Sequence, residues 1–276
     1  MSESVLSSYI LFNGIFHKKE DKLFTADIFE KFLFKEKIRA TNCHLLFWEE
    51  QIEQINRQFE LLHIKESSVT QNGGKELKRQ IERNLTKNKL FKDALFTFYF
   101  FKNETDTSYM IKAEKITAED ELISVKGIFL SLNPYNIKNI SAFSQFAAGS
   151  EIFWKYAQLI TKSPFEPLLQ NHDGIILEVP GKNLFIIKDN NVYTPNITEG
   201  AFRSPAFPLV REICTKLKMD FIQDQKISTD DLTDADEIFL VSHIQGIQRV
   251  TGFKNKRYFL NKTRQIARLF QGKMLK

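Results

Sequence analysis

Three consecutive predicted strands in the middle of the chain constrain its fold more than any other feature. Leu168–Gln170 and Ile175–Leu177 are apolar runs, and Asn171–Gly174 between them has the residues of a tight hairpin turn. Asn183–Ile187 is the next predicted strand, and the acidic residue Glu178 follows the second one. The segment therefore predicts paired strands that hold one carboxylate beside a short connection.

Five further segments carry short patterns whose order along the chain is more informative than any one of them. The first contains Asn13-Gly14, a pair that favours the type I′ turn of a hairpin. In chain order the segments are Tyr9–Phe16, Phe29-Glu30, Thr194-Pro195 with Glu199-Gly200, Asp231–Leu240 and Gln245–Ile247. Together with the three strands, this order resembles the class IV aminotransferases, which include branched-chain and D-amino-acid aminotransferases and aminodeoxychorismate lyases.

The resemblance covers nearly the whole chain and implies a fold. It implies the α+β, two-domain fold of the fold-type IV pyridoxal-phosphate enzymes, which is D-amino-acid aminotransferase-like. We expect an N-terminal α/β sandwich domain over residues 1–132 and a C-terminal pseudo-barrel domain over residues 133–276, connected at Asn133-Pro134. The resemblance also implies a homodimer and a small-molecule ligand in the cleft between the domains.

The residue expected to carry the cofactor is missing. Glu178 falls on the family glutamate that holds the pyridine nitrogen, and counting back from it without a gap places the Schiff-base lysine on Gln145. A Schiff base requires a primary amine, which a glutamine amide cannot replace. The nearest amines are Lys138 and Lys155.

The positions that resemble the family's phosphate site have also changed. Gln54 stands where the family has an arginine, and a neutral amide loses the charge-assisted pair with a phosphate. Pro205 stands among the backbone N–H groups that bind phosphate at a helix N-terminus, and proline has no N–H. We expect it to start that helix instead. The family-equivalent cofactor-binding positions are Glu178, Gln54, Ser204, Pro205, Ala206, Val241 and Ser242.

Two functions from different classes follow. The first is a non-catalytic ligand-binding or interaction protein that keeps the fold and binds no pyridoxal phosphate, so no cofactor is expected. The alternative is an active pyridoxal-phosphate-dependent aminotransferase or 4-amino-4-deoxychorismate lyase whose lysine is shifted, with Lys138 the better candidate. In either case Val241 removes the hydroxyl of a family threonine, which Ser242 replaces in part. His243 faces either the cleft or a dimer partner.

Composition excludes several other classes of function. The 276 residues are 42% hydrophobic, enough to bury a sizeable core, and the two cysteines suggest no disulfide framework. No spacing of ligands suggests a metal site. The net charge of +5 comes without a nucleic-acid-binding motif, so we expect no nucleic-acid partner. A signal-peptide pattern and apolar runs of membrane-spanning length are absent from the sequence, which predicts a cytoplasmic protein without a membrane partner.

Periodicity predicts the remaining elements. Apolar residues at helical spacing predict helices over about Leu45–Leu62, Lys75–Asn88 and Asn261–Gln271. Ala94–Phe101 and Ser108–Glu114 are predicted strands. The aromatic run in the first of them predicts a strand covered on both faces, one by its own domain and the other by a helix or a partner.

Overall fold

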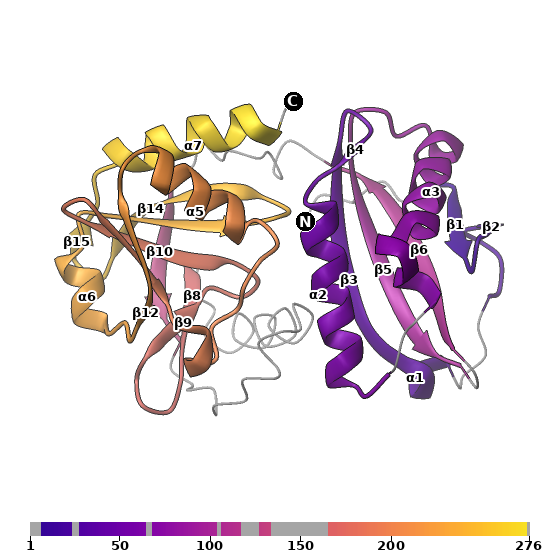
Figure 1. Ribbon diagram of the computed structural model, residues 1–276, viewed down its shortest axis with the longest axis horizontal. Helices are drawn as coiled ribbons and strands as arrows, with labels where there is room; N and C mark the ends of the chain where they lie inside the picture. Colours follow the sequence, from indigo (N-terminus) through magenta and orange to yellow (C-terminus); the bar gives the residue numbers. More distant parts are fainter. Residues whose placement is uncertain are drawn as a thin grey trace. The chain divides into compact units, whose positions relative to one another are not determined.

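The computed structural model describes residues 7–23, 28–64, 68–103, 106–116, 127–133 and 165–274. The chain divides into two compact units, Met1–Asp120 and Glu121–Lys276, each built around its own sheet (Figure 1). Gln145, Lys138 and Lys155 lie outside the described residues. Within the described part of the chain, no helix is long and apolar enough to cross a membrane.

The first unit is a six-stranded sheet in the order β2-β1-β6-β5-β3-β4. Every neighbouring pair is antiparallel, and short turns join β1 to β2, β3 to β4 and β5 to β6. The predicted turn at Asn13-Gly14 is confirmed, since both residues have positive φ. The strands are β1 (Tyr9–Phe12), β2 (Ile15–Lys18), β3 (Phe32–Thr41), β4 (His44–Leu45), β5 (Asp93–Lys102) and β6 (Thr107–Lys115).

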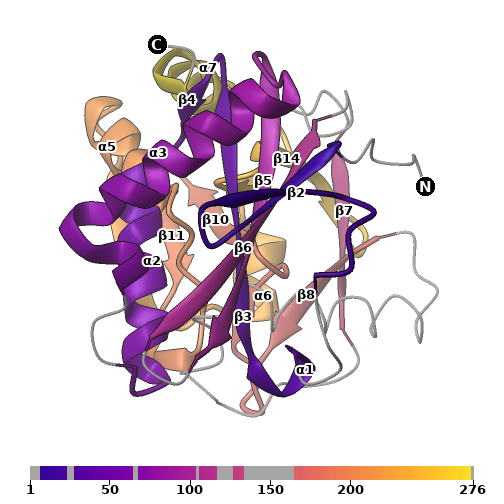
Figure 2. The same cartoon turned by 90° about the vertical axis from the view of Figure 1, so that its right-hand side faces the viewer.

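Two long helices, α2 and α3, cover one face of this sheet (Figure 2). The ring of Phe59 on α2 packs on Phe34 and Phe100, with centroids 5.1 and 5.3 Å away. Phe98 and Phe100 are fully buried on this face, which confirms that their own unit covers one side of the strand. The helical elements are α1 (Ile28–Lys31), α2 (Trp48–Leu61), the 3-10 turn η1 (Ser68–Thr70) and α3 (Gln71–Asn88).

A left-handed turn sets the start of α3. Asn72, Gly73 and Gly74 have φ values of 52°, 68° and 67°, so the regular right-handed helix begins at Lys75, as predicted. The carbonyl of Gly73 accepts a hydrogen bond of 3.1 Å from the indole nitrogen of Trp48. The turn therefore fixes α3 against α2.

A cluster of polar side chains lies inside this unit. Glu36 on β3 is 1% exposed, and the amides of Gln51, Gln54 and Gln58 on α2 all donate to its carboxyl group. Burial raises the pKa of Glu36 to about 7, against the lowering effect of the three amides. The spacing of the glutamines places them on one face of α2, so a single buried carboxyl organises the packing of the helix on β3.

The second unit is a nine-stranded sheet in the order β12-β11-β10-β13-β14-β7-β8-β9, with β15 paired to β14. At one end, β9 contacts β10 and β11, so the sheet curls on itself as the expected pseudo-barrel does. The strands are β7 (Ile128–Leu132), β8 (Glu166–Gln170), β9 (Ile176–Glu178), β10 (Asn183–Lys188), β11 (Asn191–Pro195), β12 (Asp220–Gln225), β13 (Glu237–Ser242), β14 (Gly246–Phe253) and β15 (Lys256–Arg257).

The division between the units differs from the expected one. The sequence placed Ile128–Leu132 in the first domain, but this strand pairs in parallel with both β14 and β8 of the second sheet. The division falls at Asp120/Glu121 instead of 132/133. Parallel pairing joins segments far apart in the sequence, so no local pattern near Asn133 could mark it.

The helices of the second unit are fixed by specific capping groups. The carboxylate of Glu237 on β13 accepts the first three N–H groups of α7, from Asn261, Lys262 and Thr263, at 2.8 to 2.9 Å. Ser228 and Asp231 form a capping box at α6. The helical elements are η4 (Ile197–Glu199), α5 (Phe207–Lys216), α6 (Thr229–Asp234) and α7 (Asn261–Met274).

Alanine substitution at the two adjacent glycines tests the packing of the left-handed turn. A Cβ at Gly74 would lie 2.6 Å from Cδ1 of Ile52, whereas a Cβ at Gly73 meets nothing within 4 Å. Both glycines have positive φ, which costs an alanine about 1 to 2 kcal/mol. We expect Gly74→Ala to lower the free energy of unfolding by about 1 to 3 kcal/mol more than Gly73→Ala does. Urea denaturation measures both, and equal losses would contradict the steric explanation.

The buried carboxyl of Glu36 predicts a pH dependence of stability. Because its pKa is raised to about 7 in the folded chain, the folded state holds a proton that the unfolded state releases above about pH 4.5. The stabilisation is complete below pH 4.5 and is lost as the pH rises through 7. We expect Glu36→Gln to reduce the loss of unfolding free energy between pH 5 and 8, measured by urea denaturation. Glu60→Gln, an exposed change on α2, the helix whose glutamines contact Glu36, is the control, and identical pH profiles for both variants would refute the assignment.

Candidate functional site

Glu178 lies at the end of β9, and a short turn through Val179–Lys182 leads to β10. Its side chain is 4% exposed, and Oε2 accepts a hydrogen bond of 2.7 Å from the backbone N–H of Phe202. The backbone N–H of Gly181 donates to the same carboxyl group. Burial outweighs these two donors and raises the pKa of Glu178 to about 8, so at neutral pH the group is largely the uncharged acid.

Asn183, the first residue of β10, fixes the loop that faces Glu178. Its Oδ1 accepts from the backbone N–H of Ser204 at 2.9 Å, and its Nδ2 donates to the carbonyl of Phe202. One amide thus holds both a donor and an acceptor of the loop backbone, and each such buried bond contributes about 1 kcal/mol. Asn183 was recognised as part of a sequence pattern, but its partners are far away in the chain.

The backbone N–H groups at the expected phosphate position all have partners inside the protein. Ser204 N–H donates to Asn183, Ala206 N–H donates to Oγ of Ser204 at 3.2 Å, and Phe207 N–H donates to the Ser204 carbonyl at 2.9 Å. Pro205 has no N–H. A helix N-terminus binds anions through free N–H groups, and this one offers none between Ser204 and Phe207.

The start of α5 corrects the role expected for Pro205. The helix begins at Phe207, and Pro208 rather than Pro205 occupies its first turn. Pro205 lies in the preceding turn, which the Phe207–Ser204 bond closes. Proline is well placed in a first helical turn, because N–H groups there have no partner within the helix.

Ser204 and His243 fill the space between this loop and the end of β13. Ser204 Oγ accepts from the backbone N–H groups of Ala206 and His243, at 3.2 and 3.1 Å, and Nδ1 of His243 lies 3.4 Å from it. Both side chains are buried. A hydroxyl has two lone pairs, so both acceptor positions of Ser204 Oγ are used within the protein. His243, which the sequence placed in a cleft or at a dimer partner, contacts Ser204, a residue that was also expected at the cleft.

Val241 and Ser242 complete the same region. Val241 is fully buried and pairs with Asn183 across β13 and β10. Ser242 Oγ accepts from the N–H groups of Ile244 and Gln245, at 3.2 and 2.9 Å, so its hydroxyl closes a tight turn. The structure therefore brings Glu178, Ser204, Pro205, Ala206, Val241 and Ser242 into one connected region of the second unit.

Gln54 lies in the first unit and donates to Oε1 of Glu36 at 3.3 Å. The amide that we expected at the position of the family's phosphate arginine is thus engaged with a buried carboxyl. The sequence did not single out Glu36, because its pairing with α2 depends on contacts between separate elements. Among the described residues, no group of three or more acidic, histidine or cysteine side chains could hold a metal.

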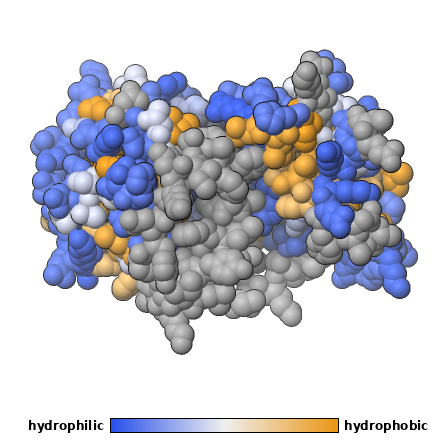
Figure 3. Space-filling view, turned by 90° about the horizontal axis from the view of Figure 1, so that it is seen from below, coloured by the Kyte–Doolittle hydropathy of each residue, from blue (hydrophilic) through white to orange (hydrophobic). Residues whose placement is uncertain are grey.

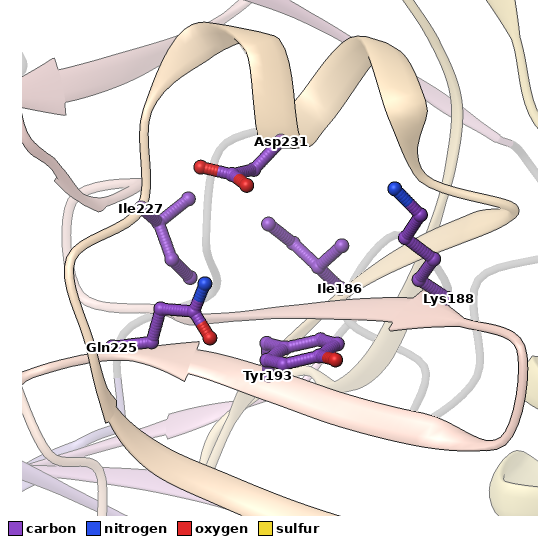
Figure 4. Close-up of a pocket in the computed structure, with 6 residues that line it drawn as sticks. All are labelled: Ile186, Lys188, Tyr193, Gln225, Ile227 and Asp231. Atoms are coloured by element: carbon purple, nitrogen blue, oxygen red, sulfur yellow. The ribbon is translucent and has the colours of Figure 1, made fainter.

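A cavity of about 140 Å³ opens elsewhere in the second unit (Figure 4). Ile186 and Tyr193 form part of its wall, and α6 contributes Asp231. Of the predicted site residues that the structure describes, none is among those that line this cavity. The lining residues are Ile186, Lys188, Tyr193, Gln225, Ile227 and Asp231.

Several solved structures are similar to this chain over most of its length. The branched-chain aminotransferase of Thermoproteus uzoniensis, solved with norvaline, is 16% identical and has a TM-score of 0.82 over 98% of this chain and 95% of that chain. The branched-chain aminotransferase of Thermobaculum terrenum, solved in its PLP form, is also 16% identical, with a TM-score of 0.80 over 98% and 94%. A putative 4-amino-4-deoxychorismate lyase of Legionella pneumophila is 18% identical, with a TM-score of 0.75 over 92% and 96%.

These likenesses confirm the two-domain fold-type IV architecture. Among curated proteins, none matches this sequence. The family model of amino-transferase class IV matches residues 33–253, which include strands of both sheets and the region around Glu178. The chain belongs to the class IV aminotransferase family.

Proposed function

We propose that this chain is a class IV aminotransferase family member that has lost pyridoxal phosphate and serves as a non-catalytic ligand-binding or interaction protein. The observation that carries the proposal is the occupied set of N–H groups from Ser204 to Phe207. A phosphate there would have to break internal bonds that the loop already makes, at a cost of about 1 to 3 kcal/mol for each buried group left unpaired.

Two further observations support the loss of the cofactor. Gln54 supplies an amide to Glu36, where the family has an arginine for the phosphate. A second anion beside a buried carboxyl is unfavourable whenever that carboxyl is ionised. The sequence also places Gln145 at the Schiff-base position.

One observation favours the alternative, an active aminotransferase or 4-amino-4-deoxychorismate lyase. Glu178 keeps its buried position at the end of β9, where the family binds the pyridine nitrogen. That enzyme would use Lys138 as its shifted lysine. Lys182, a buried lysine close to Glu178 in sequence, is engaged with Glu166 through an Nζ–Oε1 contact of 3.1 Å. If the alternative holds, the cofactor would supply electron withdrawal from a bound amino compound, and Glu178 would hold its ring nitrogen.

Absorbance spectroscopy separates the two functions. We expect purified protein incubated with pyridoxal phosphate, then desalted, to show no visible absorbance of a cofactor–lysine Schiff base. The Thermobaculum terrenum enzyme, solved in its PLP form, is the positive control. A band that borohydride abolishes, with a modified lysine found by mass spectrometry, would overturn the proposal. Modification at Lys138 would establish the alternative enzyme.

We also propose that the chain forms a homodimer. Tyr99 and its cross-strand neighbour Met110 lie on the sheet face opposite α2 and α3, and both are only half-buried. Figure 3 shows hydrophobic residues grouped on the first unit as seen from below. Apolar surface of this kind is typical of interfaces. Among the described residues of the unit, the exposed large apolar ones are Ile15, Phe32, Leu61, Leu62 and Phe91.

Light scattering at micromolar concentration tests this assembly. We expect twice the 32.3 kDa mass of the chain. Tyr99→Glu should shift the mass toward the monomer, because it would place an unpaired charge in the interface. Phe259→Glu, at a residue that is 78% exposed in the second unit, is the control and should leave the mass unchanged. A monomer mass for the unaltered chain would refute the homodimer.

A further inference from the structure

The positive charge of this chain is concentrated in one short segment. Residues 75–92 contain seven basic and two acidic residues, a net charge of +5, and the formal net charge of the whole chain is also +5. The other residues therefore balance to zero. The segment comprises the right-handed part of α3 and the turn that follows it. Its basic residues are Lys75, Lys78, Arg79, Arg83, Lys87, Lys89 and Lys92.

Helix α3 separates these charges from its apolar side. Leu77 and Ile81 are buried against the first unit, whereas Arg79, Arg83 and Lys87 are exposed. We call these three cations the basic stripe. They recur every four residues, so successive charges are about 6 Å apart along the helix axis.

Two aromatic rings of the β1–β2 hairpin contact two cations of the basic stripe. The guanidinium carbon of Arg83 lies 5.3 Å from the ring centroid of Phe16, and Nζ of Lys87 lies 4.5 Å from that of Tyr9. Asn88 of α3 bonds both the N–H and the carbonyl of Tyr9, at 3.0 and 3.2 Å, which joins the hairpin to the helix. Charges held on rigid elements lose less conformational entropy when a partner binds.

Between the hairpin and α3 lies an open groove of about 430 Å³. The basic stripe lines it together with Phe16, Thr86 and Glu82. At the hairpin, Ile15 is 63% exposed and provides apolar surface next to Phe16. The groove therefore combines three cations, of which Arg79 also contacts Glu76 at 3.2 Å, with the carboxylate of Glu82 and an apolar edge.

We propose that this groove is a docking site for an acidic helix of a partner protein. Carboxylates spaced four residues apart on that helix would match the spacing of the basic stripe, and one cation of the partner would pair with Glu82. Nucleic acid fits less well, because Glu82 repels phosphates and cations already cover the rings of Phe16 and Tyr9 that bases would stack on.

The inference names a partner for the proposed interaction role and in that respect rests on it. It uses no residue at the family's cofactor positions, so the spectroscopic test and a binding test can fail separately. If the chain binds pyridoxal phosphate and the acidic helix, only the loss of the cofactor is wrong. If it binds neither, only the docking site is wrong.

Fluorescence anisotropy with a designed peptide tests the docking site. The probe is an alanine-based helical peptide with glutamates at three positions spaced four residues apart and one lysine placed to reach Glu82. A scrambled peptide of the same composition, with its charges spread around the helix, is the control probe. We expect the full chain to bind the ordered peptide about tenfold more tightly than the scrambled one at low salt, and the difference to shrink at 0.5 M salt, an order-of-magnitude expectation for surface ion pairs.

Two triple variants distinguish position from total charge. R79E/R83E/K87E reverses the basic stripe, and K216E/R264E/R268E reverses three exposed cations of the second unit. Both change the net charge equally. We expect only the first to lose about tenfold in affinity for the ordered peptide, and a peptide with lysines in place of the glutamates to bind that variant instead. Binding of the swapped peptide also shows that the variant is folded.

Three results would overturn the docking site. Equal loss in both variants would show that total charge alone drives binding. Equal affinity for ordered and scrambled peptides would show that the groove does not recognise carboxylates at helical spacing. Tighter binding of single- or double-stranded DNA than of the ordered peptide, lost on reversal of the basic stripe, would assign the groove to nucleic acid.

Discussion

The side-chain amide of Asn183 is the interaction on which the second unit's loop region depends. By accepting from Ser204 and donating to Phe202, it sets the path of the loop that leads into α5. That path places the Phe202 N–H against Glu178 and the Ser204 hydroxyl against His243. Without the amide, buried donors and acceptors on both sides of the loop would lose their partners together.

The result is a polar region in which Glu178 and Ser204 have hydrogen-bond partners within the protein. Glu178 is held by two backbone donors, and Ser204 uses its lone pairs on Ala206 and His243. Burial raises the pKa of Glu178, and neighbouring backbone groups do not supply enough positive potential to reverse this. Such a region is stable without a ligand, which is the physical basis for proposing that this chain keeps the family fold without the family's cofactor.

The sequence predicted those parts of the fold that local signals determine. Asn13-Gly14 and the turn before β9 specify hairpins, and apolar spacing specifies α2, α3 and α7. The boundary of the second unit was missed because β7 joins its sheet through parallel pairs with distant strands. Glu178 and Ser204 were proposed through family patterns. The contact of His243 with Ser204 was not expected, because it joins residues 39 positions apart in the sequence.

The charge of α3 shows a different limit of sequence reasoning. Basic residues occur along the whole chain, but the excess of positive over negative charge lies in residues 75–92. The rings that contact Arg83 and Lys87 belong to the hairpin, about 70 residues earlier in the chain, so no local motif predicts these contacts. An interaction surface built from two distant segments becomes visible only when the sheet brings them together.

In each unit, the polar groups expected to bind a phosphate have hydrogen-bond partners within the protein. In the first unit Gln54 meets the buried Glu36, and in the second the loop from Ser204 to Phe207 meets Asn183 and itself. An arginine at position 54 would lie beside the carboxyl of Glu36 and would pair with it instead of with a ligand. A residue other than proline at position 205 would add one N–H group beside others that already donate within the protein. On the proposed function, no single reversion restores anion binding, because each expected donor now stabilises the fold of its own unit.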